Sequence, residues 1–297
     1  MEKRRIKKSK EDIFFDVVMY TVAIILIFIV LYPMYFIVIA SISNPTAVSN
    51  GEIFFWPKGI NIKAYIKLAG YSQLWTGYRN TIFYVAAGSI VTLLVNIPAA
   101  YALSRKELFG RKLATIFYLI PMFFTGGLIP TYLAVKGFGL LDTIWVMVIP
   151  FSVVTYYIIV GKTFFSNTIP DDIWEAAQLD GCGYLNFFVR IVLPLSKAVI
   201  AVIALWAAVG QWNSYFNALI YLRSPSLQPL QIILRNILIS NQTISAMTTG
   251  AAAVEAKQMA DLIKYAVIVV SSAPIMCMYP FVQKYFNQGV MLGSLKG

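Results

Sequence analysis

Histidine is missing from this sequence of 297 residues, and cysteine occurs only twice. Without histidine, most zinc sites and every nucleophilic site that needs a histidine base are excluded. The two cysteines, Cys182 and Cys277, are far apart in the chain, so they form neither a metal-binding motif nor a disulfide framework. We therefore expect no catalytic residue and no metal site, and we expect that the chain is not an enzyme.

Charged residues are also scarce, at 12% of the chain, whereas hydrophobic residues make up 59%. A soluble domain carries about 25% charged residues. A water-soluble protein of this length could not cover so much apolar surface, whereas lipid solvates it directly. Because the apolar runs extend from one end of the sequence to the other, we predict an all-α membrane protein in which residues 1–297 form a single transmembrane domain.

The net charge of +11 raises the question of nucleic-acid binding. Binding to phosphates needs a basic stripe or face. Here the lysine and arginine residues stand in short clusters between apolar runs, which in a membrane protein is a signal for orientation. We therefore predict membrane lipid, and no nucleic acid, among the partners.

Six stretches are long and apolar enough to cross a bilayer, which takes roughly 20 residues of helix. The predicted spans are residues 14–43, 80–103, 113–135, 143–165, 198–222 and 262–286. The first run is longer than the core of a signal peptide, so it is expected to be a retained span. Basic clusters at residues 3–8 and 105–112 place both termini in the cytoplasm.

The loop between the fourth and fifth spans, residues 167–194, has an unusual sequence. Pro170 and the two aspartates that follow it are typical of a helix start. Gly181 is typical of a helix end, and Pro194 is expected to stop a second short helix before the fifth span. Such an amphipathic helical elbow could fill a groove on another protein or rest on lipid headgroups.

This loop resembles the signature of the permeases of ATP-binding cassette (ABC) importers. The resemblance lies in the spacing of Glu175, Ala176, Ala177, Asp180, Gly181, Ile191, Leu193 and Pro194. It implies the type I permease fold, in which the loop is a coupling helix seated in a cleft of a cytoplasmic ATPase. Glu175 would then hold the elbow or pair with a basic group at that cleft, Gly181 would supply the bend, and the two alanines would allow close approach.

Two further stretches are similar to the maltose-type, carbohydrate-uptake branch of that family. They are residues 211–217 in the fifth span and the ending at residues 279–297, which looks like the oligosaccharide subgroup. The resemblance implies a bacterial inner-membrane permease that imports an oligosaccharide by alternating access. Its implied partners are a second permease subunit, a solute-binding protein and an ATPase dimer that carries the ATP and Mg²⁺.

A transport path must be wet, so polar residues within the spans are its candidates. Amides can bond sugar hydroxyls, and Asn213 and Asn217 are four residues apart, which would place them on one helical face. The same residues could equally serve hydrogen bonding between helices. The predicted path comprises Asn80, Gln211, Asn213, Tyr215 and Asn217, with Asn96, Thr125, Tyr132 and Tyr156 as further candidates.

Other functions remain open at this point. A secondary transporter driven by an ion gradient would usually place an acidic residue at mid-membrane, and the span interiors here hold almost none. A membrane enzyme would lack obvious chemistry. An ABC permease for another small solute stays the main alternative.

Overall fold

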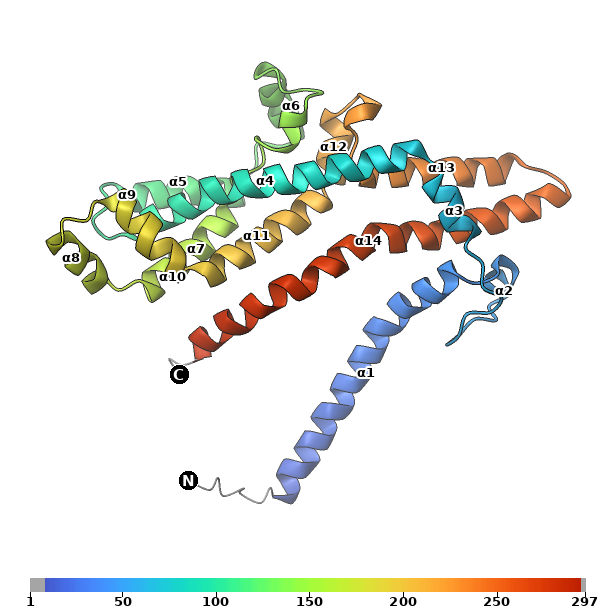
Figure 1. Cartoon of the computed structure of the whole chain (residues 1–297), viewed down its shortest axis with the longest axis horizontal. Coiled ribbons are helices and arrows are strands. Elements are labelled where there is room, and N and C mark those ends of the chain that lie inside the picture. The colour runs from blue at the N-terminus through green and yellow to red at the C-terminus, as the bar shows by residue number, and fades with distance from the viewer. Residues whose placement is uncertain (1–8, 295–297) are drawn as a thin grey trace. The chain divides into compact units, whose positions relative to one another are not determined.

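The computed structural model describes residues 9–294, and every regular element among them is a helix (Figure 1). The remaining ends, and the side chains of residues 251, 279 and 281–294, lie outside the described part. Most of the predicted C-terminal motif, residues 279–297, therefore lies outside it as well. The chain divides into two compact units. One holds residues up to 70 with 237–270, and the other holds 71–236 with the residues from 271 onward. The single domain expected from sequence stays a prediction.

The first unit is built on helix α1 (Lys10–Ser41), which begins with a capping box between Ser9 and Asp12. Short helices α2 (Pro45–Ser49) and α3 (Lys63–Ala69) follow. The unit also contains the second part of α13 (Leu230–Met247) and the first part of α14 (Ala251–Ser294). Lys67 donates to the Asn241 side chain at 3.0 Å, which ties α3 to α13.

The second unit is built around α4 (Ser72–Ser104), which packs along α7 (Thr155–Thr168) and α11 (Lys197–Trp212) (Figure 1). Small residues let these helices approach closely. A Cβ atom on Gly161 of α7 would lie 2.8 Å from the Cβ of Ala100 on α4, and one on Gly88 would lie 2.5 Å from the Gln211 side chain of α11. Small residues at such contacts are typical of helix packing in membranes.

Shorter helices complete this unit at both ends of α4. They are α5 (Arg111–Phe123), α6 (Leu128–Gly137), the 3₁₀ helix η1 (Ile144–Met147), α8 (Asp171–Leu179), α9 (Tyr184–Phe187), the π-helical turn η2 (Phe188–Val192), α10 (Leu193–Leu195), α12 (Tyr215–Tyr221) and the 3₁₀ helix η3 (Pro225–Leu227). One buried cluster joins α4, α7 and α11 to the loop that carries α8, and another joins α4 to η1 and α12.

A fully buried asparagine supports the irregular segment that precedes α7. The Asn96 amide on α4 donates to the Ser152 carbonyl at 2.7 Å, and its oxygen accepts from the Val154 backbone at 2.9 Å. Pro150 interrupts the helix in this segment because proline has no backbone donor. Asn96 thus satisfies backbone groups that a helix would have paired internally, as membrane burial requires.

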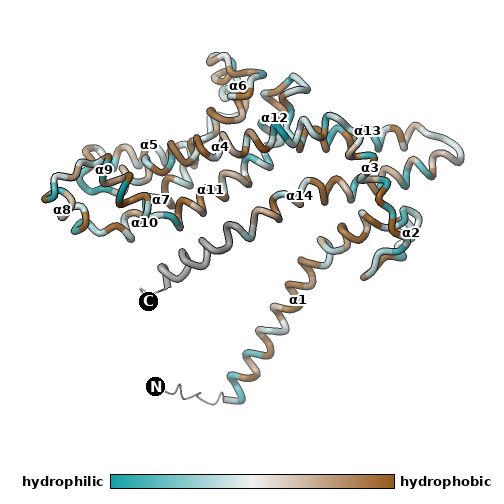
Figure 2. Tube along the Cα trace, viewed as in Figure 1, coloured by the Kyte–Doolittle hydropathy of each residue, from teal (hydrophilic) through white to brown (hydrophobic). Residues whose placement is uncertain are grey.

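Three of the predicted spans overlap single helices that could cross a membrane. Among the described residues, α1, α4 and the part of α14 from residue 252 to 278 are long and apolar enough to cross a membrane, and two bent helix pairs raise the number to five. Figure 2 shows hydrophobic residues along α4 and α11. The six predicted spans are therefore not all present as single helices.

Three predicted spans were wrong as continuous helices. The span at 113–135 bends by 117° between α5 and α6, where Gly127 takes a φ of 83°. The span at 143–165 is regular α-helix only from Thr155 onward. The span at 198–222 breaks at Asn213 and Ser214, between α11 and α12. Side chains from other helices satisfy the backbone groups that these breaks leave free, so a segment with a break can stay apolar overall. A hydropathy profile therefore does not detect such breaks.

We predict that Gly161→Ala destabilises the second unit by about 1–3 kcal/mol, because the added methyl group overpacks the contact with Ala100. Gly210→Ala is the matched control in α11, where a Cβ atom would meet nothing within 4 Å. The control should be neutral or gain up to about 1 kcal/mol from helix propensity. Thermal unfolding in detergent checks both variants, and equal melting temperatures would contradict the packing argument.

Candidate functional site

The loop at residues 167–194 forms two short helical pieces, as its sequence predicts. Helix α8 has Pro170 at its N-cap and Asp171 and Asp172 in its first turn. Gly181 follows α8 with a φ of 75°, a left-handed conformation that glycine adopts cheaply. The backbone amides of Gly181 and Cys182 bond back to the carbonyls of Gln178 and Ala177, both at 2.9 Å, which closes the helix end.

The second helical piece differs from the prediction for Pro194. Residues 184–195 form α9, the π turn and α10 in succession, and Pro194 stands in the first turn of α10. The residues before it are themselves helical, so this proline lies inside a continuous helical run, just after the π turn and one residue before the run ends at Leu195. The chain instead turns by 81° around Ser196, the residue between α10 and α11.

An aromatic cluster supports the loop from inside. Trp174 is buried, stacks on Tyr184 with ring centroids 4.5 Å apart and meets Phe187 edge-on at 4.9 Å. Ala177 is buried beside it, and Ile191 and Leu193 pack against the same core. The loop is therefore a packed, rigid unit rather than a flexible connection.

The outer face of the loop carries apolar side chains in the open. Leu179 is 91% exposed and Leu185 is 76% exposed. Glu175, Ala176 and Asp180 are also exposed, and the structure gives Glu175 no hydrogen bond or ion pair with a described residue. Of the two alanines expected to admit a partner, Ala176 is accessible, whereas Ala177 is turned into the chain's own core.

Two cations from the end of α4 hold the start of α8. The Arg105 guanidinium donates to one Asp171 carboxylate oxygen at 3.1 Å, and the Lys106 ammonium donates to the other at 2.8 Å. The hydrogen bond from Lys106 keeps the pKa of the Asp171 carboxyl below its ordinary value. We call this set of three residues the charge clasp.

A small polar hollow of about 150 Å³ lies between α4, α7, α11 and α12. The Gln211 amide lies in it and donates to the Met147 carbonyl at 3.1 Å. Tyr157 lines it, and the ring of Tyr157 stacks on Trp206 with centroids 5.8 Å apart. The polar side chains lining the hollow are Thr92, Tyr157, Gln211, Ser214 and Asn217. Amides, hydroxyls and stacked rings suit a polar ligand with apolar faces, which is the chemistry of a sugar.

Three of the five predicted path residues, Asn80, Asn213 and Tyr215, do not line this hollow. Asn80 is buried and donates to the carbonyls of Ser226 and Gln228 at 2.8 and 3.0 Å, so it fastens the η3 segment to α4. Asn213 is exposed and donates to the Val209 carbonyl of its own helix. The predicted shared face of Asn213 and Asn217 was wrong, because the helix breaks between them.

The other path candidates have different surroundings. The Tyr215 ring lies under the Arg235 guanidinium at 5.7 Å. Tyr132 accepts a hydrogen bond from Arg223 at 3.3 Å, and Thr125 is exposed in the bend between α5 and α6. Tyr156 packs on Trp206 at 5.3 Å, next to the hollow. Asn96, as described above, supports the backbone instead.

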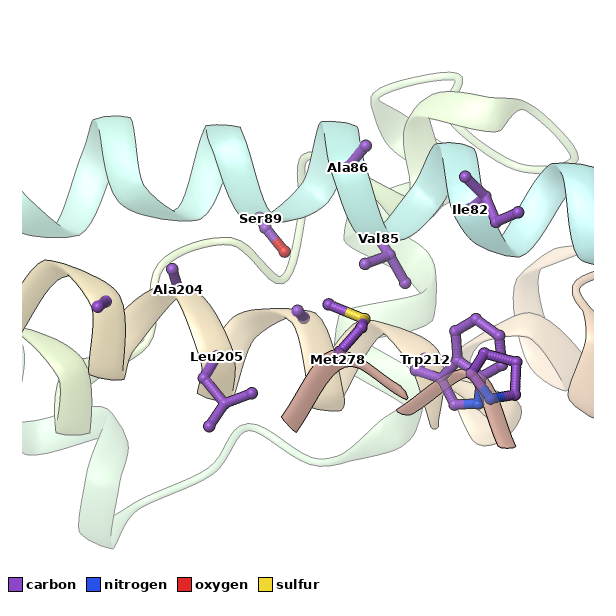
Figure 3. A pocket seen from close by; sticks show the side chains of 11 residues that line it. Ile82, Val85, Ala86, Ser89, Ala204, Leu205, Trp212 and Met278 are labelled. Carbon is purple, nitrogen blue, oxygen red and sulfur yellow. The ribbon is translucent and has the colours of Figure 1, made fainter. Parts of the chain in front are cut away.

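A larger hollow of about 570 Å³ is lined almost entirely by hydrocarbon (Figure 3). It lies between the α4 residues Ile82, Val85 and Ala86 and small residues of α11, with Trp212 at one end. Its one hydroxyl, on Ser89, has no hydrogen-bond partner within the described part of the chain. This lining suits hydrocarbon rather than sugar hydroxyls. Among the described residues no group of three or more acidic or cysteine side chains could hold a metal ion.

Sequence reasoning missed Asp142, which joins two loops at the far end of α4 from the charge clasp. Its carboxylate accepts from the Ser224 hydroxyl at 2.6 Å and from the Ser224 and Arg223 amides at 2.8 Å. Its φ of 55° is in the left-handed region, which aspartate tolerates better than most residues. The neighbouring helices α6 and α12 project from the same side of α4 (Figure 1).

Stability should depend on pH through Asp142. The hydrogen bonds from Ser224 and Arg223 hold its pKa below the ordinary value of 3.8. A lowered carboxyl pKa stabilises the fold at neutral pH, and that contribution is lost as the pH falls through the lowered pKa. Asp142→Ala should lower the melting temperature at neutral pH, and the difference from wild type should shrink below about pH 4.

The control is Asp142→Asn, which keeps one acceptor oxygen and tolerates the left-handed backbone. It should lose less stability than the alanine variant. Melting curves in detergent from neutral to acidic pH measure the effect. A difference between wild type and Asp142→Ala that persists unchanged into acid would rule out the carboxylate as its source.

The described residues thus form long apolar helices with an amphipathic helical loop at one end, an arrangement that is typical of an all-helical membrane protein. Residues 74–292 match the family model of the binding-protein-dependent transport system inner membrane component. The chain belongs to this family, and it has the type I permease fold of ABC importers.

Named relatives cover nearly the whole chain. Protein LplC of Bacillus subtilis is 37% identical over 91% of this chain and 90% of its own length. The polygalacturonan/rhamnogalacturonan transport system permease protein YtcP of the same species is 35% identical over 95% and 98%. A solved bacterial ABC transporter involved in import of the acidic polysaccharide alginate matches with a TM-score of 0.83 and 32% identity, over 95% of this chain and 100% of that one.

Proposed function

We propose that this permease is the membrane subunit of an ATP-driven importer and that it carries a carbohydrate, specifically an oligosaccharide, into the cytoplasm of a bacterium. The support comes from the two saccharide transporters named among its matches and from the amide and aromatic lining of the polar hollow. In this proposal six crossings place both termini in the cytoplasm, and the bent pair α5 and α6 counts as one crossing. The partners are a second permease subunit and a solute-binding protein.

The observation that carries the coupling role is the exposed apolar face of a rigid loop. Leu179 and Leu185 stand open beside a core of stacked aromatic rings. Exposed leucines on a rigid amphipathic helix are typical of a helix that fills a groove on a partner. We infer that this partner is the separate ATPase, which binds the ATP and Mg²⁺, and that Glu175 and Ala176 face it at the contact.

The path for the solute runs through the polar hollow in this proposal. Gln211 and Asn217 line it from α11 and α12, on either side of the break at Asn213 and Ser214. A broken helix next to a cavity leaves backbone groups free for a polar solute, which is tolerated in membranes where the break lines such a cavity. Closing and opening around this break would provide alternating access.

The coupling role predicts that Leu179→Asp weakens binding of the ATPase at least tenfold, since loss of an apolar anchor at an interface centre costs about 2 kcal/mol. Gln178→Asp is the matched control, because it adds the same charge at the neighbouring exposed position of α8. Co-purification of the tagged complex from membranes, with ATPase quantified per permease, measures the change. Equal ATPase recovery from both variants would remove the loop from the interface.

The transport path predicts that Asn217→Ala raises the KM for uptake, because the amide lines the hollow and has no hydrogen-bond partner among the described residues. Asn213→Ala is the control, since Asn213 bonds its own helix outside the hollow. Uptake into proteoliposomes that hold the whole importer and its binding protein should be measured with galacturonate, alginate and maltose oligomers. The carbohydrate assignment would be contradicted if the importer took up none of these oligomers and took up an amino acid or phosphate instead.

A further inference from the structure

The end of α4 is a junction at which three parts of the chain meet. Its last turn holds Tyr101, whose ring meets Phe165 of α7 edge-on at 5.7 Å and packs on Phe188 of the π turn at 5.0 Å. Arg105 follows directly, with its guanidinium 5.9 Å from the Tyr101 ring centroid. One helix end therefore contacts α7, the second half of the loop and, through the charge clasp, the start of α8.

Arg105 is buried, although it carries a charge. Only 10% of its side chain is exposed, and it bonds Asp171 at 3.1 Å and lies 3.6 Å from the Glu107 carboxylate. A buried charge is strongly disfavoured when its partner is removed. The position of Arg105 is therefore determined by its surroundings, and Asp171 is bound to a fixed group rather than to a mobile surface side chain.

The start of α8 depends on this ion pair for its position. Pro170 at the N-cap provides no side-chain hydrogen bond to the helix. Asp171 uses one carboxylate oxygen for Arg105 and the other for Lys106, so its side chain is held from two sides. Because the two bonds go to different donors, they fix the orientation of the Asp171 carboxylate as well as its distance from the end of α4. A single contact would fix only the distance.

The next residue offers a contrast within the same turn. Asp172 also stands in the first turn of α8, where a carboxylate interacts favourably with the helix dipole. Its side chain is exposed, and it forms no ion pair with a described residue. Both aspartates therefore interact favourably with the dipole of α8, but only Asp171 also contacts the end of α4.

We propose that Asp171 is a positioning residue of the coupling loop: through the charge clasp it makes α8 and α4 move as one rigid body, so that motion imposed on α8 reaches the helix that lines the polar hollow. This inference rests on the proposed docking of the loop on the ATPase. The Lys106 side of the clasp is exposed and contributes little to stability, whereas the Arg105 side is buried and fixes the position of α8 relative to α4.

The test measures the distance between α8 and α4 by electron spin resonance in the purified whole importer. Spin labels are attached at Gln178→Cys on α8 and Val95→Cys on α4, both exposed positions, with the native Cys182 and Cys277 replaced by serine. Distances are recorded without nucleotide and with a non-hydrolysable ATP analogue. Asp171→Asn is compared with Asp172→Asn in the same labelled chain, and Asp171→Glu tests rescue by a retained carboxylate.

We expect one narrow distance, unchanged by nucleotide, in the wild type and in Asp172→Asn. Asp171→Asn should lose the narrow peak or shift it when the nucleotide analogue binds, and Asp171→Glu should restore it at least in part. Lys106→Gln removes only one of the two donors and should broaden the peak less. This variant keeps the test decisive if Asp171→Asn is recovered in low yield, since an unaltered peak in Lys106→Gln would then overturn the proposal.

Two results would overturn the inference directly. They are a distance that changes with nucleotide in the wild type, and a peak in Asp171→Asn as narrow as that in Asp172→Asn. Failure of the proposed docking is detected separately, by cross-linking Leu179→Cys to the ATPase in the otherwise wild-type importer. If that cross-link is absent, the coupling role fails, and if it forms while Asp171→Asn behaves as Asp172→Asn does, only the clasp proposal fails.

Discussion

The need to satisfy backbone groups away from water is the constraint on which this structure depends. In hydrocarbon, an unpaired amide or carbonyl costs several kcal/mol. The second unit nevertheless contains helix breaks, and polar side chains of the neighbouring helices α4 and α11 satisfy the backbone groups that these breaks leave free. Asn96 bonds the chain before α7, Gln211 bonds the Met147 carbonyl near the end of η1, and Gly161 lets α7 come close enough for such bonds to form.

The polar side chains of α4 fasten segments along its length. Asn80 holds η3 near the start of the helix, and Arg105 holds α8 just beyond its end. This use explains why several amides expected to line a path do not do so. Among the predicted path amides, Gln211 and Asn217 line the hollow at the break in the fifth predicted span, and Asn217 forms no bond there to a described residue.

The polar hollow beside the break at Asn213 and Ser214 and the large hydrocarbon-lined hollow differ in chemistry. The smaller one offers amides, hydroxyls and stacked rings, whereas the larger one offers hydrocarbon and a single hydroxyl. A sugar exchanges hydrogen bonds with water for hydrogen bonds with protein, and an apolar wall would leave its hydroxyls unpaired. For the proposed carbohydrate solute, the smaller hollow therefore offers the better chemical match, although it holds less space.

The sequence by itself determined the membrane class, the long apolar helices, and the start and end of α8. Helix capping at Pro170 and the left-handed turn at Gly181 depend on neighbours in the chain, so local chemistry predicts them. The family signature in the loop was readable for the same reason. Only the tertiary structure decided which spans break and what each buried polar residue bonds. Asn80 meets the carbonyl of Gln228, and Arg105 meets Asp171, across long stretches of sequence. No local pattern encodes such pairs, because they exist only once the helices have packed.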